Sequence, residues 1–266
     1  MDISIMTWNT RLYESGNEIG KEEIEQISEK DWETVIRIIK SHLEKPFSVA
    51  VLQEIPYKQN APYKDRKKWD EHVLFTEIKK IFPEEDYTII YNVSEEYQVK
   101  MTAVIAGKKE VPGENGMVKE DLIARAGHVA GSNLFVPFTI AGTDLKLLGV
   151  HPHNAAELQQ YLSENNAYRP NVILGDFNAG NYIKKGEEKD GNFTANRRNY
   201  LLLTEGYIDL CQGQYTTTNC KYIDHVLLES SLDFLEEHEY KELEVNREAT
   251  FSDHYPITFK LSCKSI

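Results

Sequence analysis

Polar residues of the types that bind cations and move protons occur in five short clusters along this chain. The clusters are Trp8-Asn9, Gln53-Glu54, His151-Pro152-His153, Gly175-Asp176-Phe177-Asn178, and the pair Ile223-Asp224-His225 with Ser252-Asp253-His254. Carboxylate and amide oxygens are the ligands that a hard cation such as Mg²⁺ prefers, and a histidine can hold or transfer a proton near neutral pH. These residue types therefore predict a site that holds one dication, orients a water molecule and protonates a leaving oxygen.

Each cluster lies at or just beyond the end of a predicted strand, which is where a rigid scaffold places catalytic groups. Apolar and β-branched runs predict strands at about residues 2–8, 47–53, 87–91, 101–106, 134–140, 145–150, 171–174, 222–228 and 256–261. A capping box at Ser28–Asp31 followed by apolar residues at helical spacing predicts a helix that ends at about Lys45. Similar spacing predicts helices at about residues 68–82, 155–165 and 195–204.

The order of these elements predicts the class of fold. Strands in bunches with helices between them favour a mixed sheet that packs on a second sheet, with helices over the outer faces. Periodicity alone also allows an open α/β sheet. Neither a Pro-, Gly- or Ser-rich linker nor an internal repeat divides the sequence, so we expect a single domain over residues 1–266.

The chain is strongly acidic, with a net charge of −13 from 43 acidic and 30 basic residues. This charge opposes non-specific adhesion to nucleic acid, because that adhesion comes from many Lys and Arg contacts with phosphates. A dication bound among carboxylates would nevertheless be the largest local positive charge and would attract phosphate. The composition therefore disfavours a passive nucleic-acid-binding module more than a metal-dependent nuclease.

The cysteines and the apolar runs indicate the compartment. Cys211, Cys220 and Cys263 show no Cys-x-x-Cys spacing, so neither a disulfide framework nor a structural zinc site is indicated. No signal peptide is recognisable, and no apolar run approaches the roughly 20 residues that span a bilayer. We expect a cytoplasmic protein without stable membrane association, and nothing in the sequence indicates a protein partner.

The polar clusters, taken in order, resemble the signature of the endonuclease/exonuclease/phosphatase superfamily, which includes deoxyribonuclease I, abasic-site endonucleases, sphingomyelinases and inositol-polyphosphate phosphatases. The motifs that carry the resemblance span residues 7–257 and are Thr7-Trp8-Asn9, Leu52-Gln53-Glu54, Gly175-Asp176-Phe177-Asn178, Ile223-Asp224-His225 and Ser252-Asp253-His254-Tyr255-Pro256-Ile257. The resemblance implies a deoxyribonuclease I-like α/β fold, a four-layer sandwich of two mixed β-sheets flanked by helices. It also implies hydrolysis of a phosphate ester by in-line attack of water, with Mg²⁺ or Mn²⁺ as cofactor.

The resemblance further implies a metal site and a water-orienting group. Glu54 would be the principal carboxylate ligand of the metal, supported by Asn9 and completed by Asp253. Asp176 would orient the attacking water. Asn178 would hydrogen-bond the phosphate, and Asn9 would lie close to it.

The histidines receive implied roles in the same way. His254, held by Asp224, would act as a base or polarise the phosphate, and His151 would donate to the phosphate or the leaving group. Arg125 would face the phosphate. The sequence departs from deoxyribonuclease I at Lys100, where that enzyme has a glutamate that pairs with the histidine corresponding to His151.

Three functions remain open at this stage. The first is a phosphodiesterase acting on DNA or RNA, either as an endonuclease or as an exonuclease. However, Ile55-Pro56 replaces the arginine with which deoxyribonuclease I enters the minor groove. The second is a phosphatase or phosphodiesterase acting on inositol phosphates, phospholipid head groups or small nucleotides. The third is a non-catalytic scaffold. We expect structural roles for His153 and His225, and a solvated helix face for the basic run Lys64–Lys68.

Overall fold

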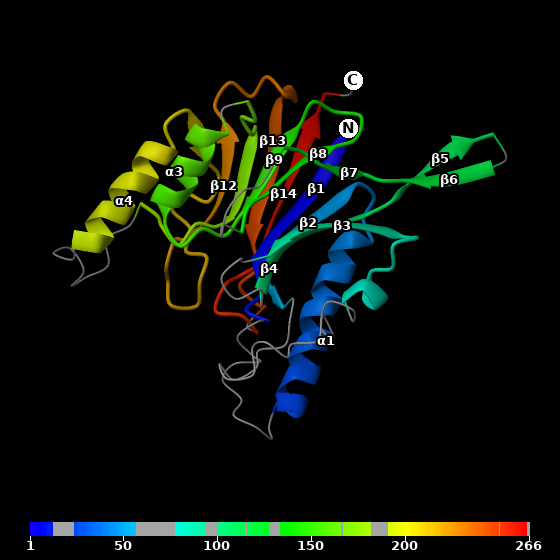
Figure 1. The fold of residues 1–266 in the computed structure, drawn as a ribbon, viewed down its shortest axis with the longest axis horizontal. Coiled ribbons are helices and arrows are strands. Elements are labelled where there is room, and N and C mark those ends of the chain that lie inside the picture. The colour runs from blue at the N-terminus through cyan, green and yellow to red at the C-terminus, as the bar shows by residue number, and fades with distance from the viewer. Residues whose placement is uncertain are drawn as a thin grey trace.

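Two stacked six-stranded β-sheets form the centre of the molecule (Figure 1). The structure is a computed structural model that describes residues 1–12, 24–56, 78–93, 100–114, 116–127, 134–165, 167–181, 191–249 and 251–264. The first sheet contains, in spatial order, β13 (Leu235–Val245), β14 (Ile257–Cys263), β1 (Asp2–Asn9), β2 (Ser48–Pro56), β4 (Lys100–Gly107) and β3 (Tyr87–Val93). The second contains β11 (Tyr207–Asp209), β12 (Asp224–Glu229), β10 (Val172–Asp176), β9 (Lys146–Val150), β8 (Val136–Ile140) and β7 (Ile123–Arg125).

Both sheets are mixed, with one parallel pair at the centre of each. Strands β1 and β2 are parallel in the first sheet, and β9 and β10 are parallel in the second. The strands next to these pairs, β14, β4, β12 and β8, run antiparallel to them. The carboxyl ends of each parallel pair and the amino ends of its antiparallel neighbours therefore lie at one edge of the sheet.

Apolar side chains of the central strands alternate between two cores. On β1, Ile3 and Ile5 enter the core between the sheets, whereas Met6 and Trp8 enter the core on the outer face of the first sheet. Successive side chains of a strand point to opposite faces, so a strand covered on both faces is apolar nearly throughout. This explains why β1 has only a partial alternation of polar and apolar residues.

Helices cover the outer faces and complete four layers. Helix α1 (Ile24–Leu43) packs Val35 and Ile39 against the first sheet. Helices α3 (Ala155–Glu164) and α4 (Gly191–Leu203) pack Leu158 and Tyr200 against the second. Figure 1 shows α1 on one side of the sheets and α3 with α4 on the other. The predicted sandwich of two mixed sheets flanked by helices is confirmed.

Several elements differ from the sequence prediction. Helix α1 begins at Ile24, before the expected capping box. Strands β7, β11 and β13 were not predicted, nor was the projecting pair β5 (Lys109–Gly113) and β6 (Gly116–Glu120). Strand β13 is rich in glutamate, which is rare in strands, and it pairs with β14 through two register shifts at the edge of the sheet. Strands β5 and β6 were not recognisable from the sequence for similar reasons. They are largely exposed, contain several charged residues and include Pro112.

Other expectations fall partly outside the described residues. Residues 78–81 are helical and end before Pro83 as predicted, but residues 68–77 of that helix and the basic run Lys64–Lys68 are not described. The single domain over residues 1–266 stays a prediction. None of the helices in the described part of the chain has the length and apolar character that crossing a bilayer requires.

Candidate active site

A cavity of about 300 Å³ opens at the edge where the two parallel strand pairs end. Asn9 and Glu54 come from β1 and β2 of the first sheet, and Asp176 ends β10 of the second. The described residues that line the cavity are Asn9, Arg11, Glu54, Lys100, Leu134, His151, His153, Asp176, Asn178, Thr217, Asn219, Lys221, Ile223, Asp253 and His254. Groups more than 200 positions apart along the chain thus meet because both sheets present the same edge to one cavity.

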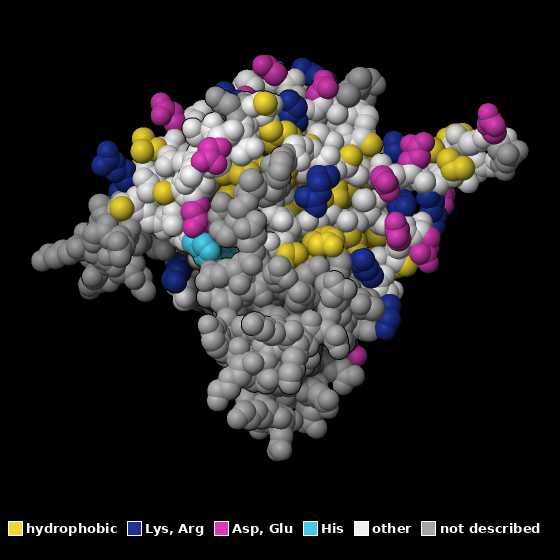
Figure 2. Space-filling view, viewed as in Figure 1, with side chains coloured by type: hydrophobic (Ala, Val, Ile, Leu, Met, Phe, Trp, Pro, Cys, Tyr) yellow, Lys and Arg dark blue, Asp and Glu magenta, His cyan; other side chains and the backbone are white. Residues whose placement is uncertain are grey.

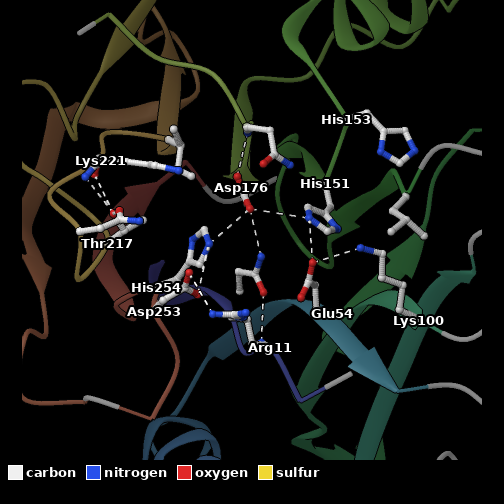
Figure 3. A pocket seen from close by; sticks show the side chains of 15 residues that line it. Arg11, Glu54, Lys100, His151, His153, Asp176, Thr217, Lys221, Asp253 and His254 are labelled. Carbon is white, nitrogen blue, oxygen red and sulfur yellow. Dashed lines mark hydrogen bonds and ion pairs between the residues drawn. The ribbon is translucent and has the colours of Figure 1, made fainter. Parts of the chain in front are cut away.

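Asp176 lies at the centre of this arrangement (Figure 3). Its Oδ2 accepts a hydrogen bond of 3.0 Å from Asn9 Nδ2. The same oxygen lies 3.6 Å from His151 Nε2 and 3.8 Å from His254 Nε2. Burial raises the pKa of Asp176 although the two imidazole rings oppose this shift. Asp176 therefore links Asn9 of the first sheet to both histidines.

Glu54 reaches the cavity through an irregularity in β2. The pairing of β2 with β4 shifts between Leu52 and Ile55, and Glu54 has a φ of 55°. Successive side chains of a regular strand point to opposite faces, and a bulge interrupts this alternation and redirects a side chain. Bulges often occur beside active sites. Glu54 Oε1 accepts a hydrogen bond of 3.1 Å from Lys100 Nζ and lies 3.5 Å from His151 Nε2.

His254 forms a buried pair with Asp224. Its Nδ1 lies 2.9 Å from both carboxylate oxygens of Asp224, and Thr216 Oγ1 donates to Asp224 Oδ2 at 2.7 Å. Burial disfavours a charged ring, but the carboxylates of Asp224 and Asp176 outweigh it and raise the pKa of His254 to about 10. His254 is therefore a cation at neutral pH, and of the two roles predicted for it, the polarising role fits this charge better than that of a base.

His151 has the opposite electrostatic character. Burial lowers its pKa to about 3, although Asp176 attracts the protonated ring, and Lys100 and His254 add to the lowering. No hydrogen-bond partner of its buried Nδ1 is present among the described residues. His151 is thus neutral at pH 7, and no carboxylate among the described residues accepts a hydrogen bond from its Nδ1.

The loop after β10 explains the Gly-Asp-Phe-Asn motif. At Gly175, where φ is 144°, a Cβ atom would lie only 2.1 Å from the carbonyl oxygen of Val150, so no side chain fits. Asn178 has a φ of 48°, and its N–H donates to Asp176 Oδ1 at 2.8 Å. The Asn178 side chain donates to the carbonyl of Pro152 at 2.9 Å. The turn thereby holds the Asp176 carboxylate in the cavity.

Two cations at the cavity were not predicted from the sequence. Arg11 pairs with Asp253 at 3.1 Å. Lys221 belongs to the loop before β12 and points into the cavity from the side opposite Lys100 (Figure 3). Neither belongs to a motif of the resemblance. Only their proximity to motif residues, Arg11 two positions after Asn9 and Lys221 before Ile223-Asp224, could have indicated them.

Of the remaining candidates, Arg125 and His225 do not line the cavity, whereas His153 does. Arg125 is exposed on β7, donates to the carbonyl of Tyr91 and is not among the described residues that line the cavity. His225 is buried behind the site, where its Nδ1 lies 3.0 Å from Asp209 Oδ2 and its Nε2 lies 2.8 Å from the carbonyl oxygen of Ala179. His153 is exposed and lines the cavity. These two contacts of His225 hold the loop after β10.

The donor atoms of the site fit a dication. Glu54 Oε2 and Asp253 Oδ1 are buried and have no hydrogen-bond partner among the described residues, although Asp253 Oδ1 lies 3.7 Å from His254 Nε2. A buried carboxylate oxygen without a partner is costly, and a hard cation would satisfy it. Ligand atoms of Asp176, Asp224 and His254 also lie within 4.8 Å of one another. That second cluster is already satisfied internally by the hydrogen bonds between Asp224 and His254.

Known structures with the same architecture agree with this reading of the fold. No protein-family model and no curated protein sequence matches the chain. The endonuclease domain of TRAS1, a telomere-specific non-LTR retrotransposon, is 13% identical with a TM-score of 0.54, and the match covers 99% of each chain. An endonuclease/exonuclease/phosphatase family protein from Leptotrichia buccalis C-1013-b is 18% identical with a TM-score of 0.55, over 98% of this chain and 99% of that one. This chain has the deoxyribonuclease I-like fold of the endonuclease/exonuclease/phosphatase superfamily.

Proposed function

We propose that this chain is a divalent-metal-dependent hydrolase of phosphate esters. The observation that carries the proposal is the contact between the two sheets at Asp176, which bonds Asn9 and lies beside His151 and His254. Attack of water on phosphorus needs groups that orient the water and stabilise charge. This cavity offers a carboxylate, an amide, one protonated imidazole and one neutral imidazole.

The dication belongs beside Glu54. Mg²⁺ or Mn²⁺ held there, with Asn9 and Asp253, would neutralise the negative charge that develops on the phosphate during attack. Asn9 orients its amide by donating to Asp176, while its Oδ1 accepts from the N–H of Arg11 at 3.1 Å. Arg11 in turn holds Asp253. The chain therefore positions each proposed ligand through a second contact.

Asp176 is the group that orients the attacking water and receives its proton. Its raised pKa makes the carboxylate a better base near neutral pH than an exposed aspartate. The hydrogen bonds from Asn9 and from the N–H of Asn178 fix both of its oxygens. Each carboxylate oxygen keeps a second lone pair that could accept from a water molecule in the cavity that Asp176 lines.

His254, His151 and Asn178 act on the phosphate. The protonated ring of His254 donates from Nε2 and stabilises the added negative charge, while Asp224 holds its other nitrogen. A neutral His151 with its proton on Nε2 donates a hydrogen bond without adding charge. Asn178 is exposed and lines the same cavity.

We further propose nucleic acid as the substrate class, because a solved relative in fold is an endonuclease domain. A small phosphate ester is the second candidate, favoured by the cavity of about 300 Å³ and the net charge of −13. On the described part of the face in Figure 2, basic and acidic side chains are interspersed, without the basic stripe that tracks a polynucleotide backbone. Both candidates use the same catalytic groups.

A substrate screen tests the proposal and separates the candidates. Plasmid DNA, a single-stranded oligonucleotide, sphingomyelin, inositol polyphosphates and bis-p-nitrophenyl phosphate are incubated with Mg²⁺, Mn²⁺ or EDTA. We expect metal-dependent hydrolysis that EDTA abolishes and that Glu54→Ala and His254→Ala lower by orders of magnitude. A chain that takes up no dication in calorimetry and hydrolyses none of these esters is a scaffold.

A further inference from the structure

Lys100 occupies an unusual position for a cation, directly against the proposed metal ligand. It is the first residue of β4 and pairs with Pro56 of β2, just beyond the bulge that brings Glu54 to the cavity. Its Nζ lies 3.1 Å from Glu54 Oε1, and both side chains are largely buried, at 22% and 9% exposure. A contact of this kind is screened by water much less than a surface ion pair.

The two oxygens of Glu54 have very different surroundings. Oε1 accepts from Lys100 and lies 3.5 Å from His151 Nε2, whereas Oε2 is buried without a hydrogen-bond partner among the described residues. An ammonium on one oxygen withdraws negative potential from the whole carboxylate. It also repels a second cation that approaches the other oxygen a few ångströms away.

We propose that Lys100 is a positioning residue that holds the Glu54 carboxylate and sets its affinity for the dication. This inference rests on the proposed function, because it takes Glu54 as the ligand. Lys100 satisfies Glu54 Oε1 and keeps the side chain aimed into the cavity. The same charge weakens cation binding, so the site is an exchangeable one rather than a tight structural site.

Substitutions of Lys100 can separate its two effects, the hydrogen bond that holds the Glu54 carboxylate and the charge that weakens cation binding. Lys100→Met keeps an unbranched apolar chain of similar length but removes the ammonium, so the repulsion disappears and Glu54 loses its partner. A bound dication then becomes the partner of both oxygens. Lys100→Arg keeps the positive charge and a hydrogen-bond donor, and the affinity should stay near that of the wild type.

Isothermal titration calorimetry with Mn²⁺ alone tests the inference on the full chain. We expect Lys100→Met to bind Mn²⁺ about tenfold more tightly than the wild type or better, and Lys100→Arg to stay within about threefold. Lys221→Met is the matched control, because Lys221 lines the same cavity from the opposite side (Figure 3). Its effect on affinity should be smaller than that of Lys100→Met.

Folding is checked by thermal unfolding with and without Mn²⁺. A larger rise in melting temperature on adding Mn²⁺ to Lys100→Met than to the wild type supports the inference independently of calorimetry. If Lys100→Met does not fold, Lys100→Gln replaces it, since glutamine can still donate to Glu54 Oε1 without a charge.

The outcomes distinguish this inference from the proposed function. If the wild type binds Mn²⁺ and Glu54→Gln abolishes the binding, but neither Lys100→Met nor Lys100→Gln binds more tightly, Lys100 does not set the affinity and only this inference is overturned. If neither the wild type nor any Lys100 variant takes up Mn²⁺, the metal-dependent function is overturned together with it.

Discussion

His254 Nδ1 lies 2.9 Å from both carboxylate oxygens of Asp224, 30 positions away along the chain. Both side chains are buried, and Asp224 also accepts from Thr216 Oγ1. The pair therefore carries its charges in a region of low polarity, where the proton on His254 is strongly held. The behaviour of this proton gives two measurable consequences.

The first consequence is a dependence of stability on pH. Because the pKa of His254 rises from 6.5 to about 10 on folding, its charged form stabilises the folded chain fully below pH 6.5. This contribution is lost as the pH rises through about 10. We expect the free energy of unfolding of the wild type, minus that of His254→Gln, to fall between these pH values in urea titrations. A difference that rises with pH would contradict the assignment.

The second consequence concerns turnover. Asp224→Asn removes the negative charge that favours the protonated ring, so the pKa of His254 should fall. We expect kcat/KM for the best substrate of the screen to drop by roughly 10²-fold or more at neutral pH. Titration of the His254 ring signals by NMR measures the pKa directly. An unchanged pKa in the variant would show that Asp224 does not control this proton.

Glu54→Gln tests the metal site. Glutamine can still accept from Lys100 but offers a neutral oxygen, so Mn²⁺ uptake should be lost and kcat should fall by about 10²-fold or more. EDTA should lower the activity of the wild type in the same way. The matched control is Glu120→Gln on the exposed strand β6, which should bind Mn²⁺ as the wild type does. Equal losses in both variants would point to a general effect of charge.

Gly175→Ala tests the close approach of β9 and β10. The new Cβ would lie 2.1 Å from the carbonyl oxygen of Val150, so the backbone must move and the Asp176 loop with it. We expect a loss of about 3 kcal/mol or more in the free energy of unfolding. Gly213→Ala is the control, because Gly213 has a φ of 81° with open space around its Cβ position. Its loss should be about 1 kcal/mol, and equal losses would exclude the steric clash as the cause.

His225→Ala should act on stability through the second histidine–aspartate pair. Although burial opposes both charges, their attraction raises the pKa of His225 and lowers that of Asp209. Removing one member of a buried pair leaves the other charge uncompensated, at a cost of roughly 3–5 kcal/mol. Urea unfolding measures this loss of unfolding free energy. His153→Ala is the control, because His153 is exposed and its removal should change the free energy of unfolding little. A stable His225→Ala variant would show that the hydrogen bonds from the Tyr200 hydroxyl and the Cys211 N–H are enough to hold the Asp209 charge.

Local pattern and turn chemistry made much of the fold predictable. The runs at β1, β2, β4, β9 and β10 are largely apolar on both faces. At the cavity end, each strand contains or directly adjoins one polar cavity residue, respectively Asn9, Glu54, Lys100, His151 and Asp176. The polar clusters that contain Asn9, Glu54, Asp176 and His254 could be placed near strand ends from the sequence, because strand ends and tight turns are encoded by neighbouring residues. The individual roles of these four residues came from the resemblance and stay predictions. The edge strand β13 could not be predicted from the sequence, because its many glutamates do not follow the residue pattern of a strand and its position depends on pairing with β14.

By itself, then, the sequence determined which residue types stand at the strand ends and in what order. Only the tertiary structure decided which of them meet. Lys100 donates a hydrogen bond to Glu54, and Arg125 lies on β7 among residues that do not line the cavity. The reason is physical, since periodicity is a property of a few neighbouring residues. Distances between distant side chains depend on how two sheets stack and on which way one bulge turns a carboxylate.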